Sequence, residues 1–169
     1  KNHLPYRVSG GYINQDGTLK TSNMERGTLS INLNPNLLNN HLTIGLNAKG
    51  TITNNRFANS GAVGEAVRFD PTQPVYSENG YNGYFSWGAN SNATSNPVAT
   101  LNDKNDVSNA KRFIGNAQID YKIHGFEDLR LNLNLGLDYA KSSGTVDIAS
   151  GVEMVSKDGD PRGNHTDYS

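Results

Sequence analysis

The fold is decided by the stretch from Leu129 to Tyr139, which reads LRLNLNLGLDY. Successive side chains of a β-strand point to opposite faces of its sheet, so strict alternation predicts a strand with two unlike faces. One face carries five leucines and Tyr139. The other face carries Arg130, Asn132, Asn134, Gly136 and Asp138.

The same alternation recurs in four earlier segments. Strands are predicted near 6–13, 25–33, 41–54 and 111–123, in addition to 129–141. These segments are longer than the roughly 5 to 6 residues typical of strands in soluble proteins. About twelve residues at roughly 3.3 Å each, tilted by about 45°, cover close to 28 Å, which is near the thickness of the hydrocarbon core of a membrane.

The predicted strands are joined by connections of two kinds. Short turns are expected at Asn34–Asn40 and at His124–Asp128, whereas long segments lie at Asn14–Asn23, 55–110 and 142–169. Short turns on one rim and long loops on the other are typical of bacterial outer-membrane barrels, whose long loops are extracellular. The sequence therefore predicts an all-β fold, an antiparallel transmembrane β-barrel segment with long extracellular loops.

About five strands do not close a barrel, because the smallest closed barrels have about eight. We expect residues 1–169 to form one partial barrel domain with two unpaired edges. In this prediction 55–110 is a long extracellular loop and 142–169 an extracellular loop or tail. The chain begins at Lys1 with no signal peptide before it, so we expect it to start inside a longer polypeptide.

The alternative is a soluble β-sandwich, a carbohydrate-binding or adhesin module, whose strands also alternate between a buried and a wetted face. The two folds differ in what covers the apolar face from Leu129 to Leu137. A second sheet over that face would favour the sandwich, whereas an uncovered face would favour the barrel wall.

Composition excludes several classes of function. Only 34% of the residues are hydrophobic and no stretch is long enough for a transmembrane helix. A net charge of -1 without a basic run argues against a nucleic-acid partner. The chain has no cysteine and no recognisable catalytic motif, so we predict neither an enzyme nor a cofactor.

No metal site is predicted. The acidic clusters of the loops do not follow the twelve-residue calcium-loop pattern. The histidines show no paired spacing of the kind that holds zinc. They are His3, His41, His124 and His165.

A loop rich in glycine, asparagine and serine carries the candidate binding residues. Its aromatic side chains include Tyr81, Tyr84, Phe85 and Trp87. Flat aromatic faces stack on the C–H faces of sugars, and neighbouring amides bond to hydroxyls, so one interpretation is a glycan contact with Trp87 foremost. The other interpretation is that these rings pack against each other as the loop's own core. Both remain open at this point.

Three stretches resemble a known family. They are YRVSGGYINQDG at 6–17, AVRFDPTQPVY at 66–76 and LNLNLGLDY at 131–139. They are similar to the barrel of SusC/RagA-type TonB-dependent outer-membrane transporters. The resemblance extends from about Tyr6 to Tyr139 and is most specific at Phe69–Tyr76.

The resemblance implies a place and a role. Such transporters have a 22-stranded barrel filled by a plug, and this chain would supply about five strands without the plug domain. It implies a multi-pass β-barrel in the bacterial outer membrane that imports oligosaccharides or peptides. The implied partners are a SusD-like lipoprotein, which the Asp70–Pro74 loop would face, and the TonB complex, through parts that this chain does not include.

Overall fold

The structure is a computed structural model that describes residues 5–88, 92–126, 128–156 and 162–169. The chain divides into two compact units. Unit 1 takes in residues up to Ile13, Glu25–Thr53 and Ala110–Ser142. Unit 2 takes in Asn14–Met24, Asn54–Asn109 and the residues from Ser143 onward.

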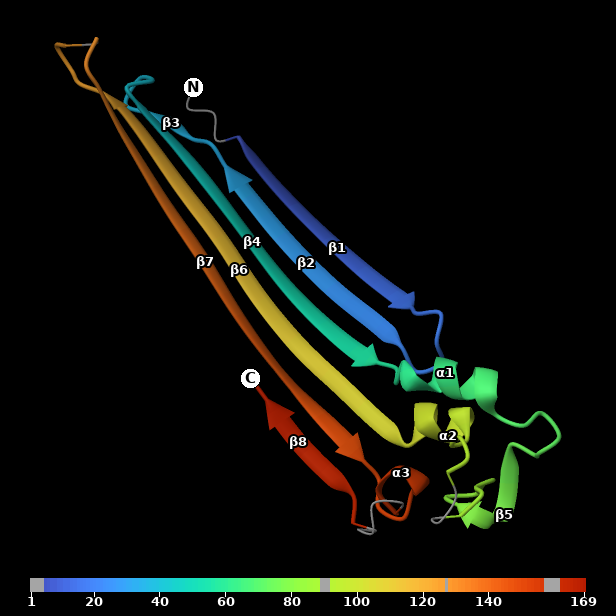
Figure 1. The fold of residues 1–169 in the computed structure, drawn as a ribbon. Coiled ribbons are helices and arrows are strands. Elements are labelled where there is room, and N and C mark those ends of the chain that lie inside the picture. The colour runs from blue at the N-terminus through green and yellow to red at the C-terminus, as the bar shows by residue number, and fades with distance from the viewer. Residues whose placement is uncertain (1–4, 89–91, 127, 157–161) are drawn as a thin grey trace. The chain divides into compact units, whose positions relative to one another are not determined.

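Long antiparallel strands dominate the described residues (Figure 1). The long strands are β1 (Tyr6–Asp16), β2 (Asn23–Leu33), β4 (Leu42–Phe57), β6 (Lys104–Lys122) and β7 (Arg130–Ile148). With the short β8 (Asn164–Tyr168) they follow one another in one sheet as β1-β2-β4-β6-β7-β8, and β3 (Asn36–Leu37) pairs with β4. The predicted all-β fold class is confirmed.

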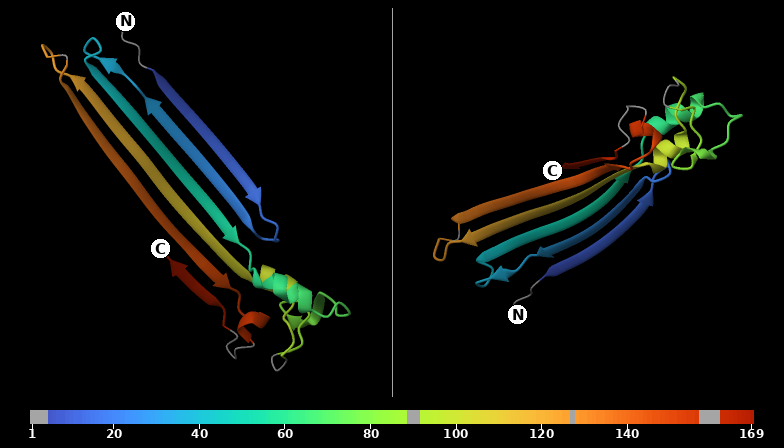
Figure 2. Two further views of the ribbon diagram at one scale, coloured as in Figure 1. Left: turned by 45° about the horizontal axis from the view of Figure 1, so that its top comes forward. Right: turned by 90° about the horizontal axis from the view of Figure 1, so that it is seen from below.

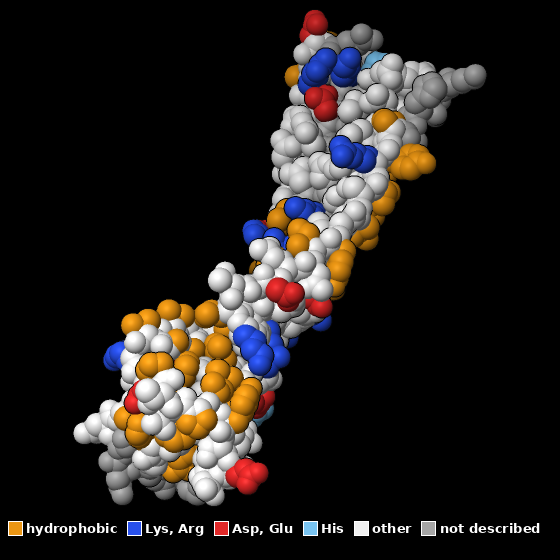
Figure 3. Space-filling model, turned by 90° about the vertical axis from the view of Figure 1, so that its right-hand side faces the viewer, with side chains coloured by type: hydrophobic (Ala, Val, Ile, Leu, Met, Phe, Trp, Pro, Cys, Tyr) orange, Lys and Arg blue, Asp and Glu red, His pale blue; other side chains and the backbone are white. Residues whose placement is uncertain are grey.

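One face of unit 1 is apolar and uncovered. Leu131 is 63% exposed and Leu137 is 60% exposed, and Val8, Leu29 and Ile52 are also exposed. Among the described residues the long strands belong to a single sheet, and both views in Figure 2 show them side by side in one layer. Figure 3 shows hydrophobic side chains along one margin of this strand region. The second sheet that a sandwich requires is not present in the described part of the chain.

The other face of unit 1 holds polar contacts between neighbouring strands. Arg112 on β6 pairs with Asp138 on β7, and Arg26 Nε on β2 donates to Thr53 Oγ1 on β4 over 3.3 Å. The hydroxyls of Ser9 on β1 and Ser30 on β2 are 2.7 Å apart. The alternation of the sequence thus separates a hydrogen-bonded face from an apolar one.

The two short turns lie in unit 1. The connection between β2 and β4 contains β3 and then three residues with left-handed backbone, Leu38, Asn39 and Asn40, at φ of 51°, 51° and 67°. Asparagine adopts this conformation more readily than most residues. The turn between β6 and β7 contains Gly125 at φ 86°, where the missing side chain removes the steric penalty.

Strands β6 and β7 extend past the ranges expected from hydrophobicity. β6 begins at Lys104 rather than near 111, and β7 continues to Ile148 rather than ending near 141. The regular apolar alternation stops in these extensions, although the backbone pairing continues. The end of β7 pairs with β8, with Gly144 opposite Tyr168 and Ile148 opposite Asn164. The range 142–169 therefore contains paired strands in addition to irregular segments.

Unit 2 has a small core. Within 55–110 lie α1 (Gly61–Arg68), β5 (Tyr76–Tyr81) and α2 (Pro97–Asn102), and α3 (Glu153–Ser156) follows β7. The described hydrophobic residues that are buried are Ala62, Ala99 and Val152, and all three lie in unit 2.

Candidate functional site

The candidate loop is built on a two-residue hairpin in unit 2. Asn82 and Gly83 both have positive φ, 49° and 80°, and Tyr81 pairs with Tyr84 across them. Two such residues make the type I′ turn that suits the twist of a hairpin. The Ser77 N–H donates to the Gly83 carbonyl over 2.9 Å. The turn therefore sets two of the predicted residues, Tyr81 and Tyr84, directly on either side of it.

The aromatic rings of the loop pack against one another. The ring centroids of Phe85 and Trp87 are 5.2 Å apart in an edge-to-face arrangement, and those of Phe69 and Phe85 are 6.2 Å apart. The ring centroids of Tyr76 and Tyr84 are 5.5 Å apart. Arrangements of this kind stabilise a packed cluster. These contacts support the interpretation that the rings form the loop's own core.

Trp87 is the predicted residue best placed for an external contact. It is 40% exposed, whereas Tyr81, Tyr84 and Phe85 are only partly exposed. Its edge-to-face contact with Phe85 holds the indole while part of its surface stays open to solvent. The four predicted residues therefore lie in one loop, and Trp87 offers the largest open aromatic surface among them.

Asn96 ties this loop to helix α2. Its side chain is 1% exposed, and its oxygen accepts from the Val98 N–H at 3.0 Å and the Ala99 N–H at 3.5 Å. Its Nδ2 donates to the Val75 carbonyl at 2.7 Å and to the Phe85 carbonyl at 3.3 Å. One buried amide thus caps a helix and holds both ends of the hairpin.

A second pair of contacts joins the hairpin to the end of α2. Asn102 donates to the Tyr84 hydroxyl at 2.9 Å, and Asn82 donates to Asp103 Oδ1 at 3.0 Å. Burial raises the pKa of Asp103, the hydrogen bond from Asn82 opposes this rise, and the negative charge of Glu153 adds to it. The loop is therefore anchored at its turn as well as at its ends.

The Asp70–Pro74 segment forms a compact turn. Asp70 Oδ1 accepts from the Thr72 N–H at 2.9 Å and the Thr72 hydroxyl at 2.8 Å, and these bonds lower the pKa of Asp70. The Gln73 N–H donates to the Asp70 carbonyl over 3.1 Å. This arrangement is an Asx turn, which accounts for the acidic residue before the proline.

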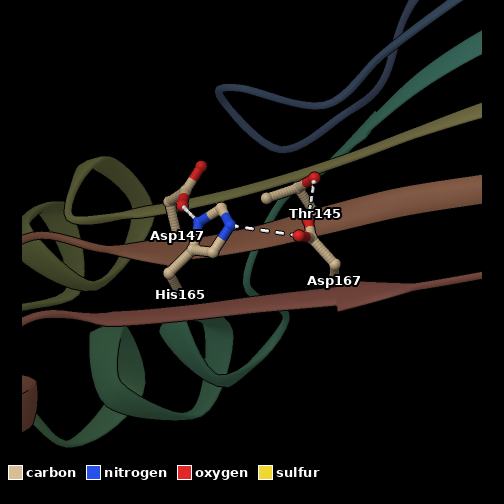
Figure 4. A network of polar contacts seen from close by, with 4 residues as sticks. All are labelled: Thr145, Asp147, His165 and Asp167. Carbon is tan, nitrogen blue, oxygen red and sulfur yellow. Dashed lines mark hydrogen bonds and ion pairs between the residues drawn. The ribbon is translucent and has the colours of Figure 1, made fainter.

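A polar network lies where β7 pairs with β8 (Figure 4). His165 Nδ1 is 2.5 Å from Asp147 Oδ1, and its Nε2 is 3.3 Å from Asp167 Oδ2. The Thr145 hydroxyl donates to Asp167 over 2.8 Å. Hydrogen bonding to Asp147 and the charge of Asp167 raise the pKa of His165, while Thr145 and His165 lower the pKa of Asp167.

Two further histidines lie close together in space although they are far apart in the sequence. His41 and His124, on the two short turns, stack with ring centroids 4.0 Å apart. Within the described ranges, no group of three or more histidine, cysteine or acidic side chains has the geometry of a metal site. His3 lies outside the described residues.

None of the helices in the described ranges combines the length and apolar character needed to cross a membrane.

Sequence reasoning missed the residues that organise the loop. The dipeptide Asn82-Gly83 is a strong hairpin signal between flanking strands. Asn96 followed by Pro97 is the pattern of a helix N-cap with proline at the first helical position. Both signals are present in the sequence, although neither shows that the hairpin and helix α2 contact each other.

The described fold defines a class: a segment of an antiparallel, membrane-type β-sheet wall with one apolar and one polar face. No family model matches the chain. In an alignment of 166 residues that covers 87% of the chain, it is 40% identical to the TonB-dependent receptor SusC of Bacteroides thetaiotaomicron. It is 31% identical over 120 residues, or 70% of its length, to the TonB-dependent receptor P26 of Formosa agariphila.

The chain belongs to the SusC-like TonB-dependent receptors of the bacterial outer membrane. It spans 17% of the length of SusC and 12% of the length of P26. The matched proteins are receptors, in agreement with a role other than catalysis. The resemblance found in the sequence is thereby confirmed at the level of the family.

Proposed function

We propose that the whole protein imports oligosaccharides, or peptides as the second choice, across the outer membrane. A SusD-like surface lipoprotein would deliver the substrate, and the TonB complex would supply the energy through parts of the protein outside this chain. The observation that carries the proposal is the 40% identity to a TonB-dependent receptor over 87% of the chain.

Unit 1 would supply part of the barrel wall. Its leucine face would contact lipid. Arg or Lys facing lipid at the midplane of the bilayer costs about 2 to 4 kcal/mol, whereas apolar residues such as leucine form the lipid-facing band of these barrels. Its polar face, with the Arg112–Asp138 pair, would border the lumen and the plug. The edge of β1 would continue into strands of the protein that lie outside this chain.

Unit 2 would supply extracellular structure near the substrate entrance. Trp87 would stack on a sugar ring, held in place by Phe85 and by the anchoring of the loop through Asn96. The Asp70–Pro74 turn would contact the lipoprotein. Tyr81 and Tyr84 would act mainly by shaping the hairpin.

Uptake by the whole protein tests the proposed transport. Cells carrying it should accumulate a labelled oligosaccharide, and the accumulation should stop when TonB is deleted. Accumulation that persists without TonB, or a protein that is released from the membrane fraction into buffer without detergent, would refute the assignment.

A variant of Trp87 tests the substrate contact. We expect Trp87→Ala to reduce uptake at low oligosaccharide concentration and to leave uptake at saturation nearly unchanged, because a stacking contact acts on binding. Tyr76→Ala is the matched control, because Tyr76 is also exposed and aromatic but its ring contacts Tyr84, whereas the ring of Trp87 contacts Phe85. Equal losses in both variants would assign Trp87 to the loop core alone.

A further inference from the structure

A hollow lies on the apolar face of unit 1. Its volume is about 870 Å³, and its walls are apolar side chains on five strands. Three glycines on three neighbouring strands form its floor, Gly10 on β1, Gly27 on β2 and Gly50 on β4. The wall residues are Tyr12, Leu29, Ile52, Phe113 and Tyr139.

Within the described chain, neither a close contact nor the backbone conformation requires glycine at these three positions. A Cβ added at Gly27 or at Gly50 would meet no atom within 4 Å, and one added at Gly10 would first meet a backbone oxygen at 3.9 Å. None of the three has a positive φ. Glycine weakens a strand and often marks a place where something else approaches closely. The space above the glycines is therefore free for an external group.

Two cations lie beside this hollow. Lys111, which also lines it, is two positions before Phe113 on β6, and Lys141 is two positions after Tyr139 on β7. Alternation along a strand places each lysine on the same face as the wall residue it neighbours. Because the chain reverses between β6 and β7, both lysines lie toward the same end of the hollow.

No carboxylate in the described part of the chain forms an ion pair with either lysine. By strand alternation, the acidic residue that unit 1 places on this face is Glu25, on β2, which is separated from β6 by β4. The hollow thus combines an apolar floor with two lysines at one end that have no ion-pair partner in the described part of the chain.

We propose that this hollow binds lipid A of the outer leaflet, with one acyl chain over Gly10, Gly27 and Gly50 and a phosphate between Lys111 and Lys141. The inference rests on the proposed placement of unit 1 as lipid-facing wall. The lysines lie toward the strand ends that lead into the long connections, which are extracellular in such barrels. An acyl chain needs no hydrogen bonds from an apolar floor, and lysines at the interface attract anionic headgroups.

A second copy of the chain fits this surface less well. A symmetric neighbour centred on the hollow would bring its own Lys111 and Lys141 to the same place, and like charges facing each other destabilise an interface. The phosphate of a lipid instead supplies the charge that the surface lacks.

Native mass spectrometry of the whole protein in detergent tests the proposal by counting bound lipid A with two phosphates. Lys111→Gln combined with Lys141→Gln should weaken retention about fivefold for each lysine. Gly27→Val combined with Gly50→Val should abolish one bound lipid, because a Cβ at either position meets no atom within 4 Å and the valine methyls would occupy the hollow. Dephosphorylated lipid A should bind the original protein as weakly as diphosphorylated lipid A binds the lysine variant.

The controls lie on the opposite face. Lys49→Gln and Gly136→Val change residues that alternate toward the polar side, and a Cβ added at Gly136 would meet no atom within 4 Å. Both should retain the lipid. Unchanged retention in the lysine and glycine variants, or a dimer that excludes lipid from the hollow, would overturn the proposal. If either result is found while uptake and membrane association persist, the lipid site is refuted and the transporter assignment is retained.

Discussion

Arg112 on β6 holds Asp138 on β7 through two hydrogen bonds, Nε to Oδ1 at 3.0 Å and Nη2 to Oδ2 at 2.5 Å. Such two-point contacts fix the relative position of the partners as well as their charge. Both side chains are more than half exposed in this chain. The pair therefore links two neighbouring strands on the polar face while remaining open to water and salt.

The first prediction concerns the energetic coupling of this pair. A double-mutant cycle of Arg112→Gln and Asp138→Asn in the whole protein should give a small favourable coupling at low salt that fades at 1 M NaCl, because salt screens exposed charges. The measurement is the temperature at which the barrel loses its resistance to unfolding in SDS. Coupling that does not change with salt would mean that the pair is buried against the plug.

The second prediction separates the two faces of β7. Leu135→Arg should destabilise the inserted barrel by about 2 to 4 kcal/mol, because it places a charge toward lipid. Asn134→Arg, one residue away, should cost much less, because its side chain alternates toward the polar face. Folding of the whole protein from urea into lipid vesicles measures both. Equal costs would contradict the assignment of the faces.

The third prediction concerns Asn96. Asn96→Ala removes the cap of α2 and leaves the Val75 carbonyl without its donor, and together these losses should destabilise unit 2 by about 2 kcal/mol. Hydrogen exchange should accelerate in Val75–Phe85 and Pro97–Asn102 while the wall stays protected. Asn92→Ala, at an exposed position in the same connection, is the control and should change neither segment.

The fourth prediction is a pH dependence of the pairing between β7 and β8. The raised pKa of His165 contributes stability that is complete below the unfolded value of 6.5 and is lost as the pH rises through the folded pKa. The lowered pKa of Asp167 contributes stability that is complete above 3.8 and is lost as the pH falls through its folded pKa. Both contributions are therefore complete between pH 3.8 and 6.5.

Hydrogen exchange of Asn164–Tyr168, corrected for the intrinsic effect of pH, should show the greatest protection in that window. His165→Gln should remove the decline at higher pH and leave a smaller decline at low pH, because the Thr145 hydroxyl still donates to Asp167. A decline at higher pH that survives this substitution would assign the effect to another group.

The wall was predictable because its information is local. The alternation in Leu129–Tyr139 and in the 111–123 segment specifies both the strand and its faces, since each residue reports directly on its own environment. The ends of β6 and β7 were not predictable in this way. Beyond Lys111 and Lys141 the apolar period fades, and the strands continue because backbone groups pair with a neighbour, such as Asp147 with His165 on β8.

The candidate loop was predictable only in part. The sequence places Tyr81, Tyr84, Phe85 and Trp87 within one short loop, but it does not show which ring faces solvent. That depends on Asn96, which reaches back to Val75 and Phe85 through contacts between residues 21 and 11 positions apart. Single-sequence patterns carry no signal for such pairs, although they do mark the cap and the turn themselves.

The sparse interior of unit 1 has a consequence for how this protein is made. This sheet buries almost none of its leucines within itself. It therefore gains little free energy from the hydrophobic effect by folding in water. That gain comes only when lipid and neighbouring strands surround the sheet. In water, the exposed leucines and the unpaired edges of such a segment favour aggregation. Its sequence is therefore adapted to an apolar solvent on one face and to water on the other.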